Sequence, residues 1–549
     1  MSNDLPLDRL LAAERSRKGQ FLLVALTVAA LAPFLNKAFH TDDPLFLWMA
    51  QQITKHPLDP YGFSVNWSTS AEPMWKAMQN PPLCSYYIAA VASLVGWNEL
   101  VMHLAFLIWP ILSILATFAI ARRFCGRPFL AATLTLFTPA FLVSATNIMC
   151  DLMLLALWLW SIESWIAGLE RRSWLLLIVS AILAAGASFT KYFGVCVVPL
   201  LVAYTLARDR RLLFYLSLLF IPIAAVLAFE LTTRAHYGVG LFAGAVFLSR
   251  SMVKLGPPWF AQFLIGMAFT GGCLVSMLPY LAGRRWRFWV IELVGLVAFL
   301  ALFCIFVPLY PFYALGQNRS LVQIEGGVFA MIGAGVLALA VADFLRHRNS
   351  PSLLLSLWVL GTLSFVTFCN WSITGRTILP IAPAVAILCM RWWERSPQAK
   401  TLFLPYLGVF LSAIGSLLIA TADYRQAESA LDASREFQRR FQAELNTTWF
   451  ESHWGFQYYM QLWGAKALDA AASEVHSNDV LVLPSNSTAI VPLPIEKIFP
   501  PETVEFHLLP FLSTHGRGTG AAFYSSARGP IPWAVDHVPP EIYYVTRFR

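Results

Sequence analysis

Long apolar runs separated by short polar gaps dominate the chain. Crossing a hydrocarbon core of ~30 Å takes roughly 20 residues in a helix, and helices are the default because lipid offers the backbone no hydrogen-bond partner. The pattern therefore predicts a polytopic α-helical membrane protein with about 13 transmembrane helices. The apolar runs lie near residues 20–39, 100–121, 129–148, 152–169, 174–189, 192–207, 212–232, 260–282, 288–308, 326–343, 352–369, 376–391 and 402–421.

Composition supports this fold class. Hydrophobic residues make up 58% of the 549 residues and charged residues only 13%, whereas a soluble protein has roughly 25% charged residues. The formal net charge of +8 falls in short basic clusters between apolar runs, which is typical of a topology signal. We therefore expect the lipid bilayer, and no nucleic acid, as a partner. The cysteines form no CxxC or Cys/His metal spacing.

Every second gap between the runs is basic. Under the positive-inside rule these gaps are cytoplasmic, which places the N-terminus inside and the C-terminus outside. We expect a multi-pass protein of the plasma membrane, namely a bacterial inner membrane, with an uncleaved first span. The basic clusters are Arg9 to Lys18, Arg122 to Arg127, Arg171-Arg172, Arg208 to Arg211, Arg284 to Arg287, Arg346 with Arg348, and Arg391 to Lys400.

The sequence divides into three parts. Residues 1–19 form the cytoplasmic N-terminus, and residues 20–421 form the transmembrane domain with an extracytoplasmic loop at 41–82. Residues 422–549 are polar, begin with an Ala-, Glu- and Arg-rich stretch typical of a helix, and continue with short strand-like segments. They predict a small extracytoplasmic α/β domain. The expected strands are 447–451, 480–483, 503–509, 521–525 and 542–548.

The loop at 41–82 carries acids and an aromatic lining, and ordered loops of this length are usually functional. Asp42 and Asp43 follow the first span, where one carboxylate could deprotonate an acceptor hydroxyl while the other orients it. A solvated loop start is the alternative. Asp151 lies at the next outward gap, where ionisable residues are usually functional. Its alternative role is a helix cap.

Cations at the outer gaps oppose the topology rule. Lys191 and Arg376 stand on minimal loops, and Arg250 lies in a larger outer gap. Outward cations beside outward carboxylates suit an anionic leaving group such as a lipid phosphate, and snorkelling to headgroups is the alternative. His236 and Glu230 flank another outer gap. A divalent metal there stays open, because the spacing does not demand one.

In their order at alternating outer gaps, these residues resemble a known family. Asp42-Asp43-Pro44 follows the first span, Asn80-Pro81-Pro82-Leu83 closes the loop, and Thr190-Lys191-Tyr192 and Arg376-Thr377-Ile378-Leu379-Pro380 follow later. With Asp151, this arrangement is similar to the GT-C membrane glycosyltransferases, specifically the protein O-mannosyltransferase and aminoarabinose-transferase group (family 39/83-like). Gln79-Asn80 departs from the Glu-Lys that relatives of the aminoarabinose group carry, which removes one candidate metal ligand.

The resemblance implies a GT-C-like fold, a sugar donor linked to polyprenyl phosphate, and transfer to a hydroxyl at the outer face with inversion. Asp42 would be the base, and Asp43 and Asp151 would share its cavity. The expected contacts of the donor phosphate are Lys191, Tyr192, Arg250 and Arg376. The expected residues of the loop and acceptor cavity are Glu72, Asn80 and His236.

Two other classes of function remain open from the sequence. A lipid or solute transporter, or a flippase, could also have about twelve spans, but transporters place their functional charges near the bilayer midplane. A membrane scaffold with an outer binding domain explains the tail but not the charges at the outer gaps. The sugar, and the choice of protein, lipid or glycan as acceptor, are not encoded in any motif.

Overall fold

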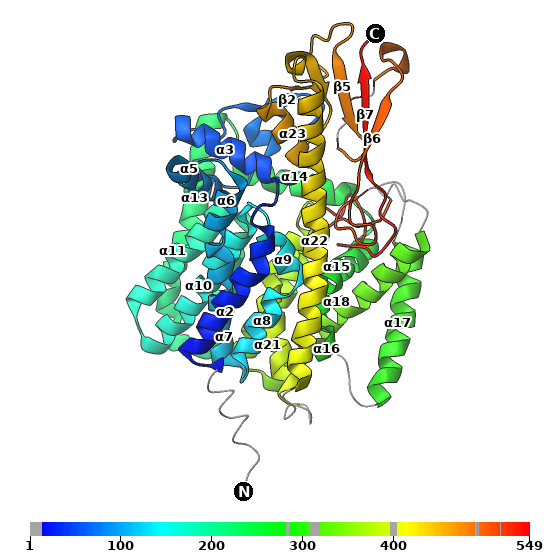
Figure 1. Ribbon diagram of the computed structural model, residues 1–549. Coiled ribbons are helices and arrows are strands. Elements are labelled where there is room, and N and C mark those ends of the chain that lie inside the picture. Colours follow the sequence, from blue (N-terminus) through cyan, green and yellow to red (C-terminus); the bar gives the residue numbers. More distant parts are fainter. Residues whose placement is uncertain are drawn as a thin grey trace.

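The computed structural model describes residues 14–281, 286–307, 319–395, 403–488, 491, 493–516 and 518–549. A bundle of helices carries a small sheet domain at one end, and α2 begins at the other end (Figure 1). The α-helices are α2 (Arg17–Leu31), α3 (Asp43–Lys55), α4 (Met74–Ala77), α5 (Leu83–Val95), α6 (Glu99–Phe106), α7 (Ile108–Phe124), α8 (Pro128–Leu136), α9 (Pro139–Ala145), α10 (Cys150–Arg171), α11 (Trp174–Thr190), α12 (Val197–Arg208), α13 (Phe220–Tyr237), α14 (Leu241–Leu255), α15 (Trp259–Cys273), α16 (Leu278–Leu281), α17 (Trp286–Phe306), α18 (Arg319–His347), α19 (Ser350–Phe368), α20 (Gly375–Ile378), α21 (Ala382–Trp393), α22 (Phe403–Arg440) and α23 (Trp454–Leu462).

Short 3₁₀ helices and strands complete the chain. The 3₁₀ helices are η1 (Ala32–Phe34), η2 (Tyr192–Cys196), η3 (Arg210–Leu219), η4 (Val275–Met277), η5 (Leu379–Ile381), η7 (Leu445–Thr447) and η8 (Ile495–Lys497). The strands are β1 (Ser64–Asn66), β2 (Ala71–Pro73), β3 (Thr448–Phe450), β4 (Lys466–Ala467), β5 (Val480–Pro484), β6 (Glu502–Phe506) and β7 (Glu541–Arg547).

The polytopic helical architecture predicted from the sequence is confirmed. Within the described residues, 7 helices are long and apolar enough to cross a membrane, or up to 8 if the bent pair α8 and α9 counts as one span. Further apolar helices of 10–17 residues pack beside them. Each predicted run falls on a helix or on consecutive helices, but several are too short to qualify alone. The count of about 13 spans therefore stays a prediction.

Prolines break two of the runs that hydropathy shows as continuous. The run 129–148 is divided into α8 and α9, which meet at 60°. Pro139 begins α9 and cannot continue the hydrogen-bond ladder of α8. The run 376–391 is likewise divided into α20, η5 and α21, with Pro380 and Pro383 at the joints.

Close helix packing holds the bundle together. A side chain at Gly271 of α15 would overlap the backbone of Phe329 on α18, and one at Gly333 of α18 would overlap Met267. The absence of Cβ atoms at these two positions lets the helices approach closely, as small residues do in membrane bundles. Elsewhere in the core, Trp158 and Trp358 meet edge to face at 4.9 Å.

The outer loop 41–82 is an ordered substructure. It contains α3, whose apolar face is buried, and an antiparallel β1–β2 ladder in which Val65 faces Glu72. Tyr61 is buried, and its hydroxyl donates to the carbonyl oxygen of Asn80 at 2.5 Å, which ties the middle of the loop to its end. The loop is therefore a rigid platform for Asp42 and Asp43.

The outer domain has a mixed five-stranded sheet in the order β4-β3-β5-β7-β6. Strand β3 pairs in parallel with β4 and β5, whereas β7 pairs antiparallel with β5 and β6. Four of the five expected strands match β3, β5, β6 and β7. The expected strand 521–525 is wrong, because this segment makes only isolated bridges.

Helix α22 joins the two parts without interruption. Its 38 residues span about 57 Å at 1.5 Å per residue, well over the ~30 Å hydrocarbon core. The expected domain boundary at 421/422 lies within this helix. Its far half buries Ala433 and Phe437 against Phe450 and Phe456 of the outer domain, so the helix is shared by bundle and sheet.

Part of the tail returns to the bundle (Figure 1). The backbone N–H of Gly375 donates to Phe523 at 2.7 Å, and that of Ser526 donates to Ile373 at 2.9 Å. Trp533 Nε1 donates to Gly272 at 2.8 Å. Residues 509–516 and 518–538 thus contact the C-terminal end of α15 and the start of α20 instead of extending the sheet.

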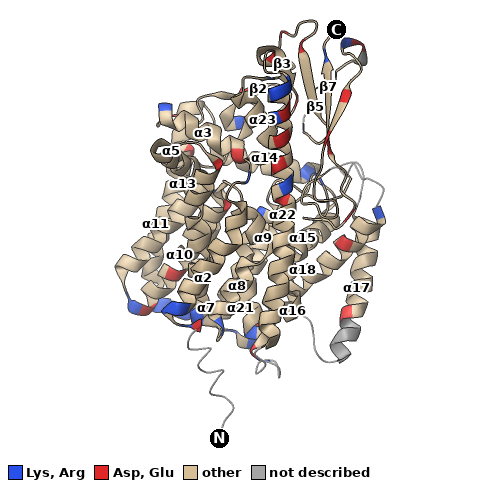
Figure 2. Cartoon of the chain, viewed as in Figure 1, with Lys and Arg blue, Asp and Glu red and all other residues tan. Residues whose placement is uncertain are grey.

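Basic residues gather at the end of the bundle where α2 begins, whereas acids are prominent at the opposite end (Figure 2). At the basic end, Arg123 of α7 forms ion pairs with Glu163, at 2.7 Å, and with Glu170. Arg208 pairs with Glu170 at 3.4 Å. These two arginines belong to two of the predicted basic clusters, whereas Arg9, Arg284, Arg285 and Lys400 lie outside the described residues, and the orientation in a membrane stays a prediction.

Candidate functional site

Asp42 and Arg376 form an ion pair at the outer end of the bundle. Arg376 Nη2 donates to Asp42 Oδ2 at 2.7 Å, although the two residues lie 334 positions apart in the sequence. The Asp42 side chain is 30% exposed and that of Arg376 only 11%. Among the described residues, no group donates to Asp42 Oδ1. This oxygen is therefore available to a substrate hydroxyl.

Asp151 connects this pair to Lys191. Lys191 Nζ donates to Asp151 Oδ1 at 2.9 Å, and Arg376 Nη1 lies 3.9 Å from Asp151 Oδ2. Asp151 lies in the first turn of α10 with its side chain 3% exposed, and Lys191 directly follows α11 with its side chain 21% exposed. Two acids and two cations from four separate gaps thus form one chain of contacts, Asp42–Arg376–Asp151–Lys191, which we call the outer charge cluster.

Asp43 has a different environment from its neighbour. It is buried, and its two carboxylate oxygens accept backbone N–H bonds from His40 at 2.8 Å and from Ile148 at 2.9 Å. Burial raises the pKa of Asp43 to about 7, although both hydrogen bonds favour the carboxylate. Asp43 fixes the loop start to the segment that precedes α10. It thereby sets the distance between Asp42 and Asp151.

A second, fully buried network lies beneath the cluster. Lys37 Nζ contacts Asp423 of α22 and donates to Asn147 at 2.7 Å and to Thr146 at 3.1 Å. Asp423 also accepts the hydroxyl of Tyr524 at 2.8 Å. The Tyr524 ring in turn lies under the Arg376 guanidinium at 5.4 Å. The tail, the last long helix and the first span therefore all support Arg376.

His40 sits between the two networks. Its Nε2 is 3.9 Å from Asp423 Oδ1, and its ring meets Tyr524 edge to face at 5.4 Å. Burial lowers the pKa of His40 to about 4; Asp423 opposes this shift, while Lys37 and Arg376 add to it. The ring is therefore neutral at physiological pH.

The outer domain holds the loop from above. Asn66 Nδ2 donates to the carbonyl of Leu468, and Gln457 Nε2 donates to the carbonyl of Asn66, both at 2.8 Å. Trp67 stacks against His453 at 5.5 Å. This ring contact joins the loop to His453, which directly precedes α23.

Two of the expected phosphate contacts lie apart from the outer charge cluster. Tyr192 packs on Phe242 at 5.2 Å and on Phe229 at 6.4 Å, and its buried hydroxyl has no hydrogen-bond partner within the described chain. Arg250 is exposed on α14. No ion pair joins it to the cluster among the described residues. The structure brings together Lys191 and Arg376 but not these two.

The expected residues of the acceptor cavity lie along the loop. His236 Nε2 is 3.5 Å from Asp59 Oδ1, which ties α13 to the loop. Glu72 stands on β2, and burial raises its pKa. Asn80 contributes the carbonyl that Tyr61 contacts. In the part of the chain that the structure describes, no group of three or more His, Cys, Asp and Glu residues could hold a metal ion.

Sequence reasoning missed the buried network. Lys37 and Asp423 sit just at the ends of apolar runs, where the rule that intramembrane charges are functional would have marked them. The residues that complete it, Asn147 and Tyr524, carry no such signal. Their role arises only from contacts across 110 and 101 positions of sequence.

One family model matches part of the chain. Residues 79–232 match the model of the family described as dolichyl-phosphate-mannose-protein mannosyltransferase. The predicted resemblance is confirmed. The predicted class of enzyme, a membrane glycosyltransferase that depends on a polyprenyl-phosphate-linked sugar, agrees with the description of this family model. The matched segment holds Asp151 and Lys191 but neither Asp42 nor Arg376. Among curated proteins, no relative matches the chain.

Solved structures give distant likenesses. An Archaeoglobus fulgidus oligosaccharyltransferase tethered with an acceptor peptide is 12% identical with a TM-score of 0.47, and the match covers 83% of this chain and 64% of that one. ArnT from Cupriavidus metallidurans, bound to undecaprenyl phosphate, is 14% identical with a TM-score of 0.39, and the match covers 85% and 93%. The mycobacterial arabinofuranosyltransferase AftD is 12% identical with a TM-score of 0.39, covering 96% and 40%. These likenesses are too distant to carry residue roles.

Proposed function

We propose that the protein transfers a sugar from a polyprenyl-phosphate donor to an acceptor hydroxyl at the outer face of a bacterial inner membrane. The observation that carries this proposal is the outer charge cluster. It combines a carboxylate that has one oxygen open with two cations that are suited to an anionic leaving group. The family match over residues 79–232 supports the same class of donor.

In this mechanism Asp42 Oδ1 accepts the proton of the acceptor hydroxyl, as a positioned general base. The acceptor oxygen then bonds to the anomeric carbon, and the bond from that carbon to the phosphate oxygen breaks. The electron pair leaves with the phosphate, so negative charge develops on the donor lipid. Direct displacement from the opposite face inverts the anomeric centre.

Lys191 and Arg376 would stabilise the departing phosphate. Both are held close to Asp151, whose charge keeps two cations side by side without a counter-ion from solvent. Preorganised cations cost little reorganisation at the moment of reaction and are more effective in a partly dehydrated site. In this scheme Asp43 does not contact the substrate. It positions Asp42, because its two carboxylate oxygens accept hydrogen bonds from backbone N–H groups.

The outer domain would form the acceptor side of the site. It contacts the loop through Asn66 and Gln457 and reaches the cluster through Tyr524. A protein, lipid or glycan hydroxyl could approach between the loop and the returning tail. The topology in this proposal has the basic end of the bundle in the cytoplasm (Figure 2).

Purified protein in lipid nanodiscs, offered radiolabelled polyprenyl-phosphate sugars and a mixture of acceptors, tests the proposal. We expect release of polyprenyl phosphate with label moving to one acceptor class, and a product of inverted configuration. A protein that moves these lipids across vesicles without transferring label would instead be a flippase, and the proposal would be wrong.

A further inference from the structure

A cavity of about 380 Å³ lies between α18 and α21. Its lining residues are Leu339, Ala342, Asp343, Leu345, Arg346, Leu388, Trp392 and Arg395. These lie at the C-terminal ends of the two helices, whereas Arg376 precedes α21 at its other end. At 1.5 Å per residue, the intervening chain places the cavity roughly 25 Å from the outer charge cluster. The cavity is therefore separate from the proposed reaction centre.

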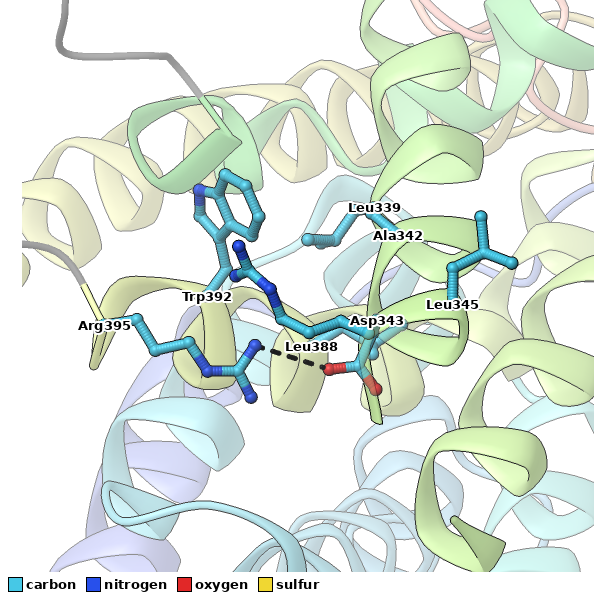
Figure 3. Close-up of a pocket in the computed structure, with 8 residues that line it drawn as sticks. Leu339, Ala342, Asp343, Leu345, Leu388, Trp392 and Arg395 are labelled. Atoms are coloured by element: carbon cyan, nitrogen blue, oxygen red, sulfur yellow. Dashed lines mark ion pairs between the residues drawn. The ribbon is translucent and has the colours of Figure 1, made fainter. Parts of the chain in front are cut away.

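Cations outnumber acids around this cavity. Asp343 Oδ1 accepts contacts from Arg391 Nε at 3.2 Å, His347 Nδ1 at 3.2 Å and Arg395 Nη1 at 3.9 Å. Figure 3 shows the Arg395 guanidinium directed at Asp343, with Leu388 and Trp392 close by. Burial together with Arg391 and Arg346 lowers the pKa of Arg395, against the opposing effects of Asp343 and Glu394. The cluster thus has positive charge in excess.

Arg346 has its donors open. Its guanidinium lies 5.8 Å from the centre of the Trp392 ring, and no acceptor for it is found among the described residues. Among the described residues, the Arg395 guanidinium makes one ion pair, the long contact to Asp343. The nearby acid Glu394 is engaged elsewhere, because its carboxylate accepts the backbone N–H of Arg127 at 2.8 Å. Two guanidiniums thus line the cavity and can hold a phosphate, which arginine binds in a bidentate manner.

Asp343 sets a second requirement for a ligand of this cavity. Its side chain is 4% exposed, and its Oδ2 accepts no hydrogen bond from the described residues. A buried carboxylate oxygen without a donor is costly. A ligand that fits the cavity therefore carries a donor, an ammonium or a hydroxyl group, beyond its anionic group. Leu345 and Trp392, which also line the cavity, are apolar side chains that are 58% and 36% exposed.

We propose that this cavity binds the headgroup of a phospholipid from the inner leaflet, with the phosphate against Arg346 and Arg395 and the headgroup donor on Asp343. The acyl chains would lie against Leu345 and Trp392. The basic end of the bundle, where the cavity lies, faces the negative cytoplasmic leaflet in the proposed topology. The site is distinct from donor binding, so it stands even if the transferred sugar is misassigned.

Native mass spectrometry of delipidated protein tests this proposal. Phosphatidylethanolamine, which has an ammonium donor, is compared with phosphatidylcholine of the same acyl chains, whose headgroup has none. We expect the wild type to retain phosphatidylethanolamine about tenfold more strongly than phosphatidylcholine. The double variant Arg346→Gln/Arg395→Gln should lose about tenfold in retention of phosphatidylethanolamine. Asp343→Asn should abolish the difference between the two lipids.

Arg348→Gln is the matched control. Arg348 is an exposed arginine at the same end of α18 that does not line the cavity, so its variant should retain lipid as the wild type does. Arg346→Gln alone, which breaks no ion pair within the described residues, serves if the double variant does not fold. Unchanged retention in the cavity variants would overturn the proposal. Displacement of the lipid by equimolar O-phosphoethanolamine would overturn the proposal that the ligand comes from the membrane. A free phosphate ester would then be the ligand.

Discussion

At the scale of single residues, neighbouring acids have separate tasks. Asp42 presents an open oxygen beside Arg376, whereas Asp43 is buried and bonded to two backbone N–H groups. The adjacent pair in the sequence suggested a shared catalytic function. The backbone geometry assigns one carboxylate to the site and the other to its framework, because consecutive residues at the start of α3 point in different directions.

Lys191 is expected to act on the donor. Lys191→Ala removes a cation that the proposal places against the donor phosphate, and charged hydrogen bonds contribute about 1.5–3 kcal/mol. The KM for the polyprenyl-phosphate sugar should therefore rise about 10- to 100-fold, with a smaller change in kcat, in steady-state transfer assays. Lys254→Ala, at an exposed lysine of the outer gap, is the control. An unchanged dependence on donor concentration would rule out this role.

His40 should make stability depend on pH. Its pKa is about 4 in the fold against an ordinary value of about 6.5. Between these values the unfolded chain holds a proton that the folded chain lacks, so the free energy of unfolding falls as the pH drops. Asp43 acts in the opposite direction over pH 4 to 7, because its folded pKa is raised. The His40 effect is therefore measured as a difference between variants.

His40→Gln removes the titrating ring and keeps a polar group of similar size. The stability advantage of the wild type over this variant should shrink by about 2 kcal/mol between pH 7 and pH 5. Thermal unfolding in detergent at both pH values gives this difference. A constant gap between the two proteins would show that His40 does not titrate as described.

At the scale of elements, the breaks in apolar runs decide where the site forms. Hydropathy finds the run 129–148 but not its 60° bend, because the residues on both sides of Pro139 are equally apolar. The same is true of the run that becomes α20 and α21. The sequence nevertheless places Asp151, Lys191 and Arg376 at one end, since each stands in a gap that the charge alternation assigns to the outside.

The contact of the tail with α20 lies beyond such reasoning. Asp423 and Tyr524 join the network across long stretches of chain, and no periodic pattern records which distant segments meet. Tyr524 belongs to the segment expected as a strand, which instead follows the surface of the bundle. Local patterns predict elements, whereas the partner of a buried hydroxyl is set by tertiary packing.

Gly375 tests whether this contact matters. A Cβ at this position would overlap the Phe523 ring, and the Gly375 N–H donates to the Phe523 carbonyl. Gly375→Ala should therefore displace the tail, loosen Tyr524 from Arg376 and lower kcat about tenfold or more, since small misplacements at a site are costly. Gly361→Ala, where a Cβ meets open space, should be neutral. Equal activity of the two variants would contradict this account.

At the scale of the whole molecule, charge separates the two ends. The sheet domain lies at one end of the bundle, and basic residues gather at the other (Figure 2). The proposed orientation follows from this polarity. It makes Asp432, on the far half of α22, external and Arg348 cytoplasmic.

Cysteine labelling checks the orientation. Single cysteines at Asp432 and at Arg348, in a background where the exposed Cys304 and Cys369 are serine, are treated with a membrane-impermeant maleimide on intact cells. The first should react at once and the second only after permeabilisation. The reverse pattern would place the outer charge cluster in the cytoplasm.

The most direct test of the central claim is the transfer rate of Asp42→Asn in lipid nanodiscs, beside the wild type and the control Asp432→Asn. Asparagine fills the same space but cannot take the acceptor proton. We predict a loss of at least about 100-fold in kcat, with thermal stability near that of the wild type and full activity in the control. Turnover retained by folded Asp42→Asn would show that the reaction uses another base.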